Sequence, residues 1–257
     1  MTTTIPVTPL ELRERIASGE WTTATAGLLD DHQQANLVVV PETAAAAFED
    51  YCASHPSTCP VLARTEPGDP TLVYQDCTVD ISTMLPRYRV WDHGTVVDEP
   101  ADLSAWWKAD SVAFALGCSH TFDGPLRRAG IAVAKTAPPV YITDRILRTG
   151  GAASMFDGPL AVSMRPVDSN LVDDAIAVTR KYPTGHGAPI HVGDPADLGI
   201  EDISRPDFGV FAGVGEGQVP VFWNCGVTPQ LALGSAGLDY AATHFPGHML
   251  VLDAVVS

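Results

Sequence analysis

A glycine- and proline-rich stretch between Gly185 and Pro195 holds the densest group of proton-transfer side chains in the sequence. Two imidazoles, His186 and His191, and the carboxylate of Asp194 lie within nine residues of one another. Histidine transfers protons readily near neutral pH, and imidazole and carboxylate are also common ligands of divalent metals. The pattern predicts acid/base catalysis or substrate contact, while metal binding and a purely structural loop remain open.

An arginine follows an apolar run in the segment Ser163-Met164-Arg165-Pro166. In a chain with 31 acidic and only 15 basic residues, such an arginine is a natural clamp for a substrate carboxylate. Its planar guanidinium can bind a carboxylate through two parallel hydrogen bonds. An internal ion pair explains the same position equally well. We therefore count Arg165 and Ser163 among the substrate-binding candidates.

Two cysteine-containing turns, Gly117-Cys118-Ser119 and Asn224-Cys225-Gly226, each join an apolar strand pattern to the start of a helix. Backbone N–H groups at such a turn can stabilise an oxyanion, and a cysteine at a helix N-terminus can act as a nucleophile or base. We expect Cys118 to be catalytic. The candidates for substrate contact at these turns are Ser119, Cys225, Thr228 and Gln230.

The thiols of Cys118 and Cys225 could form an acid/base pair at an acidic C–H bond if the two turns face each other. Such a pair would support epimerisation or elimination next to a carboxylate. Buried and inert thiols are the simpler interpretation, because free cysteine is among the most buried residue types. His244 and His248 form a second histidine pair, and each is more typical of a structural role.

The elements that must position these residues follow from the spacing of apolar, capping and turn residues. A capped helix is expected from Thr8 to Gly19. The other expected helices are the run from Pro41 through Tyr51, a short one at 106–107, and those over 121–129 and 168–181. The expected strands are 33–40, 72–79, 88–91, 112–116, 140–143, 160–164, 190–192, 219–223 and 249–252. We predict one domain over 1–257, of mixed-sheet α/β class with a smaller inserted α+β subdomain.

The composition excludes several classes of protein. A net charge of −16 argues against nucleic acid and anionic membranes as partners. No apolar run approaches the ~20 residues needed to span a bilayer, and no secretory signal is present, so a cytoplasmic location is expected. Five cysteines without a Cys-x-x-Cys pair predict reduced thiols. No phosphate-binding loop or dinucleotide motif occurs, so no organic cofactor is expected. Disorder is expected only at Met1 to Thr4.

Several runs together resemble one family, the hydro-lyases whose catalytic domain is also found in the mitochondrial D-glutamate cyclase. They occur in the family's order and span nearly the whole chain. The matching runs are Gln34-Ala35-Asn36-Leu37, Cys59-Pro60, Pro86-Arg87-Tyr88-Arg89-Val90, Gly117-Cys118-Ser119, 158–166, 186–195, Pro206-Asp207, 220–230 and Pro246-Gly247-His248-Met249-Leu250. The chain departs from the family's pattern at His120 and Asp123, and at Tyr141-Ile142-Thr143-Asp144.

The resemblance implies a lyase that eliminates water from a small carboxylate substrate, such as D-glutamate, which would yield 5-oxo-D-proline. His186 or His191 would then serve as acid and base, with Asp194 orienting one of them. Arg165 would hold the substrate carboxylate, and the Gly117–Ser119 turn or a divalent cation, Mn or Mg, would stabilise the oxyanion. Tyr141 is a further substrate-binding candidate. A hydratase or epimerase acting on another acid, a non-catalytic carboxylate-binding protein, and a homo-oligomer stay open.

Overall fold

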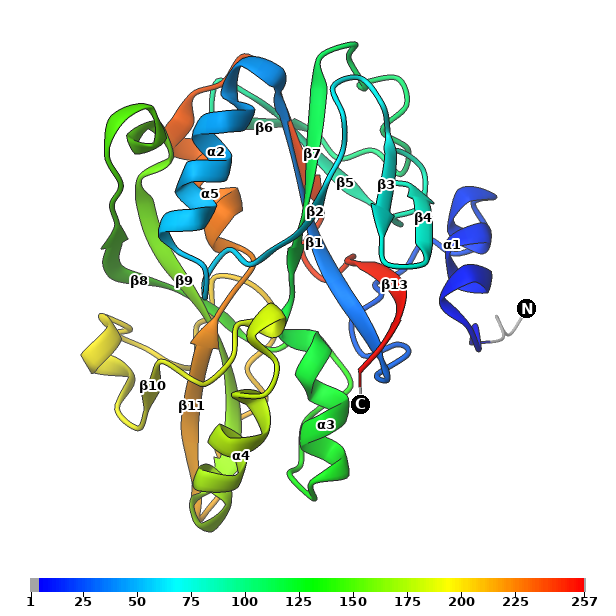
Figure 1. Cartoon of the computed structure of the whole chain (residues 1–257). Coiled ribbons are helices and arrows are strands. Elements are labelled where there is room, and N and C mark those ends of the chain that lie inside the picture. Colours follow the sequence, from blue (N-terminus) through cyan, green and yellow to red (C-terminus); the bar gives the residue numbers. More distant parts are fainter. Residues whose placement is uncertain (1–4, 257) are drawn as a thin grey trace.

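The computed structural model describes residues 5–256, so the expectation for Met1 to Thr4 lies outside the described residues. Two main sheets and the helices around them make up the molecule (Figure 1). The predicted mixed α/β class is confirmed. All strand pairs recorded within 5–256 are antiparallel. The two sheets meet in the middle of the molecule, and this junction positions the candidate site.

The larger sheet is built around β1 (His32–Pro41). Its β-branched run alternates between two cores: Leu37 and Val39 face one side of the sheet, while Val38 and Val40 face the other. The strand order is β2-β7-β1-β12-β5-β6, and β13 also pairs with β1. The bounds of the other strands are β2 Val61–Arg64, β5 Tyr88–Asp92, β6 Thr95–Asp98, β7 Ser111–Gly117, β12 Ala241–His244 and β13 Leu250–Val255.

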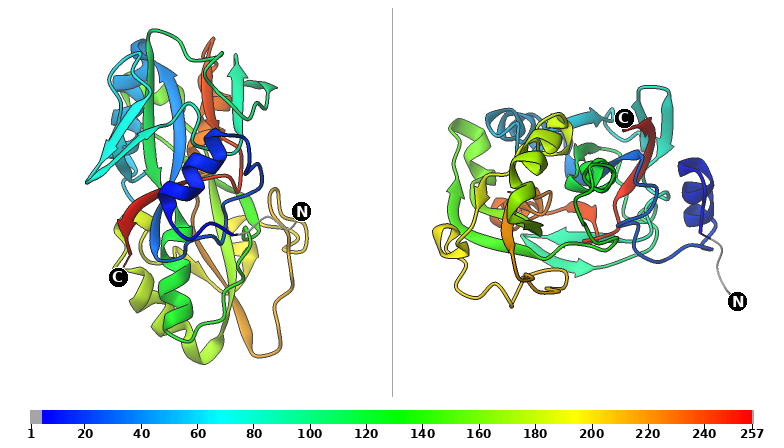
Figure 2. Two further views of the ribbon diagram at one scale, coloured as in Figure 1. Left: turned by 90° about the vertical axis from the view of Figure 1, so that its right-hand side faces the viewer. Right: turned by 90° about the horizontal axis from the view of Figure 1, so that it is seen from below.

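The smaller sheet has four strands in the order β10-β11-β9-β8. All four lie in one stretch of chain between β7 and β12 of the larger sheet, which is where we place the inserted subdomain. Figures 1 and 2 show β10 and β11 in the lower part of the molecule with α3 and α4. The strand bounds are β8 Val140–Leu147, β9 Gly158–Asp168, β10 His191–Val192 and β11 Gln218–Asn224.

Helices cover both sheets. On one face of the larger sheet, α2 (Glu42–Ser54) and α5 (Thr228–Ala236) pack with the 3₁₀ helix η2 (Gly151–Phe156) around Phe48 and Phe114. The opposite face is covered by the hairpin β3–β4 (Thr71–Tyr74 and Cys77–Asp80). The remaining helices are α1 Pro9–Ala17, α3 Asp123–Arg128, α4 Val172–Thr179, η1 Ser119–Phe122, η3 Ser169–Leu171, η4 Pro183–Gly185 and η5 Pro195–Leu198.

The first helix forms as its cap predicts, because the Thr8 hydroxyl accepts a hydrogen bond from Glu11 N at 3.1 Å. The single strand predicted over 72–79 is wrong. Gln75 has a positive φ of 51° and turns the chain into the β3–β4 hairpin. The helix predicted at 106–107 is also wrong, because Trp106 lies in a turn and Trp107 in irregular backbone. The helix predicted over 168–181 is shorter, since β9 extends to Asp168.

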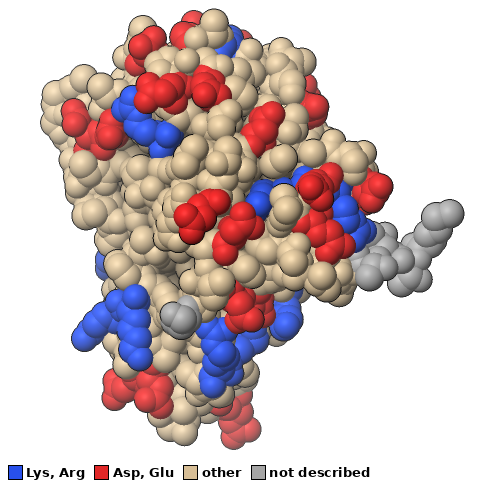
Figure 3. Space-filling view, turned by 45° about the vertical axis from the view of Figure 1, so that its right-hand side comes forward, with Lys and Arg blue, Asp and Glu red and all other residues tan. Residues whose placement is uncertain are grey.

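Charged side chains on the face drawn in Figure 3 lie in small groups, with lysines and arginines beside aspartates and glutamates. Ion pairs between separate segments of the chain include Arg64 with Glu49 and Arg13 with Asp253, each at 2.8 Å. Exposed pairs of this kind contribute little to stability, whereas Arg13 is buried and also donates to the carbonyl of Val251. Arg13 therefore fastens α1 to the last strand of the larger sheet.

Candidate active site

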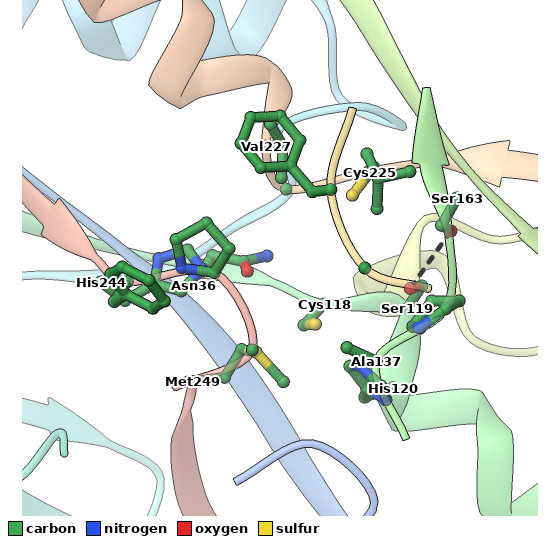
Figure 4. Close-up of a pocket in the computed structure, with 18 of the residues that line it drawn as sticks. Asn36, Cys118, Ser119, His120, Ala137, Ser163, Cys225, Val227, His244 and Met249 are labelled. Carbon is green, nitrogen blue, oxygen red and sulfur yellow. Dashed lines mark hydrogen bonds between the residues drawn. The ribbon is translucent and has the colours of Figure 1, made fainter. Parts of the chain in front are cut away.

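A cavity of about 280 Å³ lies where one end of the larger sheet meets the smaller sheet (Figure 4). Its walls come from the ends of several strands and the segments that follow them. Small-molecule sites typically occupy roughly 300–1,000 Å³, so this volume suits a small ligand. The lining side chains that carry polar or ionisable groups are Asn36, Arg89, Cys118, Ser119, His120, Ser163, Cys225 and His244.

Cys118 and Cys225 line this one cavity, although they follow strands of different sheets, β7 and β11. Burial raises the pKa of the Cys118 thiol to about 12 and the pKa of the Cys225 thiol to about 11. In each case a backbone N–H two residues further on, from His120 or Val227, works against that rise. Both thiols are therefore protonated near pH 7 and can donate protons.

His120 belongs to a buried chain of charged groups in the cavity wall. Its Nδ1 lies 2.8 Å from Asp123 Oδ2, and Asp123 Oδ1 accepts a 2.7 Å hydrogen bond from Arg165 Nε. Burial opposes ionisation of Asp123, but the Arg165 guanidinium and His120 together hold its pKa below the usual range. An aspartate bound to one ring nitrogen fixes the imidazole and leaves the other nitrogen available for proton transfer.

Arg165 is occupied by this ion pair. Its Nη1 donates to Ser163 Oγ and its Nη2 to Ser119 Oγ, each at 3.1 Å, while the guanidinium stacks on Phe122 and Trp223. It borders a second cavity of about 90 Å³, whereas the described residues that line the larger cavity do not include it. The structure thus shows the internal ion pair that the sequence left open. Ser119 and Ser163 connect that pair to the larger cavity.

Asn36 of β1 lies between the two cysteine turns. Its Nδ2 donates to the carbonyl of Gly117 at 2.7 Å, beside Cys118. A Cβ on Gly226, beside Cys225, would stand only 1.9 Å from the same nitrogen. Only glycine leaves room for this approach. Asn36 therefore holds the two turns at a fixed separation across the end of the larger sheet.

The histidine-rich loop does not line the cavity. His186 has a positive φ of 78°, its Nδ1 donates to the carbonyl of Ser57 at 3.1 Å, and burial lowers its pKa to about 4. His191 Nε2 lies 2.7 Å from the carbonyl of Asp194, whose carboxylate accepts a hydrogen bond from Ala196 N and caps η5. The structure does not bring these three predicted residues onto the cavity or into one metal-binding group. Within 5–256, no three His, Cys, Asp or Glu side chains are grouped to hold a metal ion.

The remaining predicted substrate contacts support the backbone or another side chain. The Tyr141 hydroxyl donates to the carbonyl of Ile203 at 2.6 Å, and burial raises its pKa to about 12. The Thr228 hydroxyl exchanges hydrogen bonds with the backbone of Ala161. Gln230 Nε2 lies 3.4 Å from the His244 ring. These three residues support the structure around the cavity, and Gln230 contacts His244, which lines it.

Four polar or ionisable residues of the cavity lining were not among the sequence candidates: Asn36, Arg89, His120 and His244. Asn36 and Arg89 come from strands β1 and β5, and only the pairing order of the larger sheet brings them to the cavity. His244 ends β12, and its Nδ1 accepts the N–H of Leu37 at 3.1 Å. Burial lowers the pKa of His244 to about 4, so the ring is neutral. Two of these residues carried a signal, because Asn36 and Arg89 lie within runs that match the family.

An α/β protein with two thiols, an arginine and a carboxylate-paired imidazole at one small cavity has the architecture of an enzyme. The chain belongs to the family of hydro-lyases related to D-glutamate cyclase. The family model described as "D-glutamate cyclase" matches residues 112–253. These residues include both cysteine turns, and membership supports a lyase activity.

Curated relatives match almost end to end. A Rubrobacter xylanophilus protein named "Putative hydro-lyase" is 47% identical over 95% of this chain and 94% of its own. A Bordetella pertussis protein of the same description is 44% identical over 93% of this chain and 87% of its own, and one from Rhodococcus opacus is 43% identical over 97% and 95%. A solved Methanococcus jannaschii nitrogen repressor-like protein matches 96% of this chain and 98% of its own at TM-score 0.40 and 12% identity, a likeness too slight to bear on function. No helix within 5–256 is long and apolar enough to cross a membrane.

Proposed function

We propose that this chain is a hydro-lyase that removes water from a small carboxylate-bearing substrate held in the 280 Å³ cavity. The first substrate to test is D-glutamate, with 5-oxo-D-proline as the product. The observation that carries the proposal is the meeting of Cys118, Cys225 and His120 at one cavity, with the Asp123 carboxylate 2.8 Å from the His120 ring. Dehydration needs one group that takes up a proton and another that delivers one to the departing oxygen, and this wall supplies both.

Arg89 is the proposed partner of the substrate carboxylate. Arg87 and Arg89 share the single carboxylate of Glu99, each at 2.9 Å, so two positive charges face one negative charge beside the cavity. Both guanidinium groups also lie over the Phe245 ring, at 4.4 and 4.7 Å from its centroid. The recorded ion pair of Arg89 uses Nε, which leaves its terminal nitrogens for a ligand. Arg165, by contrast, is neutralised by Asp123.

Cyclisation of D-glutamate moves two protons from nitrogen to oxygen. The ammonium group gives up one proton, the amine attacks the γ-carboxyl carbon, and the nitrogen then gives up a second proton. One carboxyl oxygen receives both protons and leaves as water, while the new C–N bond closes the ring. In our proposal His120 accepts the two nitrogen protons one after the other, with Asp123 stabilising the imidazolium. Cys118 delivers two protons in turn to the departing oxygen, and the imidazolium returns a proton to the Cys118 thiolate after each delivery, so both groups end as they began.

Proton NMR of the purified chain with D-glutamate, L-glutamate or 5-oxoproline tests this function, with and without Mn²⁺. We expect stereospecific appearance of 5-oxo-D-proline. Arg89→Ala should raise KM at least about tenfold, because it removes a charged hydrogen bond of roughly 1.5–3 kcal/mol. Arg64→Ala is the matched control, since Arg64 forms an exposed ion pair with Glu49 on the surface.

Two results would contradict parts of the proposal. Thermal stabilisation by these acids without any turnover would favour a carboxylate-binding protein. Unchanged kinetics in Arg89→Ala, alongside normal turnover, would leave the dehydration in place and remove Arg89 from substrate binding.

A further inference from the structure

The two cavity thiols approach the same space from different directions. Cys118 stands at the end of β7 in the larger sheet, and Cys225 at the end of β11 in the smaller one. Figure 4 shows their side chains on separate segments, with Cys225 above Cys118 in the view. They are close enough that a negative charge on Cys225 would oppose ionisation of Cys118. A small ligand in this cavity would therefore lie beside both thiols.

The two sulfurs share two contacts that favour the thiolate. Each sulfur receives the backbone N–H of the residue two positions on, at the start of a helical segment. The positive charge of Arg165 favours the thiolate at both positions as well. Asn36 contacts both turns and so holds them together. Inversion of a carbon centre requires two proton carriers that act on opposite faces of that carbon, and two thiols that enter one cavity from different sheets can act in this way.

We infer that this cavity also inverts, or exchanges the proton at, the carbon next to the carboxylate of a small amino or carboxylic acid, with Cys118 and Cys225 acting on opposite faces. The inference rests on the proposed function only for the place where the carboxylate binds. It does not need the dehydration step, because cyclising glutamate leaves the bond between the α-carbon and its hydrogen intact.

The step balances without any oxidant or reductant. One cysteine, as thiolate, takes the α-proton, and the electron pair of the C–H bond moves into the carboxylate to give an enediolate. The other cysteine, as thiol, then delivers its proton to the opposite face of the same carbon, and the electron pair returns to form the new C–H bond. The result is the opposite enantiomer, with thiol and thiolate exchanged between Cys118 and Cys225. In this inference His120, which lines the same cavity, accepts the proton that creates the first thiolate.

Incubation in D₂O tests the inference, with the α-proton signal of D-glutamate, L-glutamate and each enantiomer of 5-oxoproline followed by NMR and chiral chromatography. The wild-type chain should replace the α-proton of at least one of these acids with deuterium and form its enantiomer. Cys118→Ser and Cys225→Ser should each slow inversion at least about a hundredfold, because a hydroxyl is a far weaker acid than a thiol. Either variant should still exchange the α-proton of one enantiomer, through the remaining thiol.

Cys77→Ser is the matched control, since Cys77 is equally buried but lies in β4, on the face of the larger sheet covered by the hairpin. If a serine variant fails to fold, the alanine variant at the same position replaces it. Formation of 5-oxoproline with its α-proton fully retained would overturn the inference and keep the hydro-lyase proposal. Proton exchange that survives when Cys118 and Cys225 are both replaced by serine would also overturn the inference. Proton exchange without any dehydration would overturn only the proposed function.

Discussion

The two cysteine turns have the same backbone plan but different surroundings. In each, a buried strand ends, a cysteine enters the cavity, and a helical segment begins directly afterwards. The first turn is followed by the charged chain of His120, Asp123 and Arg165. The second is followed by neutral groups, with the Thr228 hydroxyl bonded to the backbone of Ala161. The comparison shows two similar thiols, of which only Cys118 is followed by a chain of further ionisable groups.

A buried neutral histidine also lies near each turn. Gly185, next to His186, lies against the Cys118 turn, where an added Cβ would stand 3.3 Å from the Cys118 carbonyl oxygen. His244 contacts Gln230 of the helix that follows Cys225. Burial lowers the pKa of both rings to about 4, so each is a weak proton acceptor near pH 7. In our proposal, proton uptake and release during dehydration run through the first turn, while the second turn holds its thiol as a partner.

The largest expected effect follows from removing the imidazole of the first turn. His120→Gln should lower turnover about 10²–10⁴-fold, the usual contribution of a positioned general acid or base. The matched variant at the second turn, His244→Gln, should lower it far less, because His244 is a neutral and structural neighbour. Steady-state kinetics of both variants check this. Equal losses would remove the functional difference between the turns.

The next effect is on stability. Asp123→Asn leaves the buried Arg165 guanidinium without its counter-ion, so the free energy of unfolding should fall by about 3–5 kcal/mol. The control Asp31→Asn breaks an exposed ion pair with Arg128 and should cost less than about 1 kcal/mol. Urea denaturation measures both variants. A loss at Asp123 no greater than the loss at Asp31 would contradict the description of the first turn as a buried charged chain.

A smaller effect should appear as a pH dependence of stability. His186 and His244 have folded pKa values of about 4, below the usual value near 6.5, so the unfolded chain binds more protons between these values. Their stabilisation is complete above about pH 6.5 and is lost as pH falls toward 4, on the order of 2 kcal/mol for each ring. Denaturation curves at pH 7 and pH 5 should differ less in His186→Gln than in the wild type. An unchanged difference would mean that His186 is not held neutral.

The smallest expected change in the free energy of unfolding is at the second turn. Thr228→Val removes the hydroxyl that bonds the Ala161 backbone, and the free energy of unfolding should fall by about 1–2 kcal/mol. The loss should not depend on salt, because no charged group takes part. Denaturation at low and high ionic strength distinguishes this variant from Asp123→Asn. A strong salt dependence at Thr228 would show that the second turn is not neutral.

Local sequence patterns predicted the strands that cross the core, because short apolar runs such as Val38 to Val40 and Val112 to Leu116 are typical of buried strands. The same patterns located both cysteine turns, where a strand pattern ends and a helix pattern begins. They could not show which side chains share the cavity, since Arg89 and Asn36 meet there only through the pairing of β5, β12 and β1. Sequence patterns also could not show that His186, His191 and Asp194 lie outside the cavity lining. His191 and Asp194 stay in contact, but the chain turns at His186, and the Asp194 carboxylate caps η5.

The most direct test of the central claim is a crystal structure of the chain with 5-oxo-D-proline. We predict the ligand between Cys118 and Cys225, with its carboxylate on the terminal nitrogens of Arg89 and within reach of His120. A ligand bound instead at His186 and His191, or against a displaced Arg165, would contradict the assignment of this cavity as the active site.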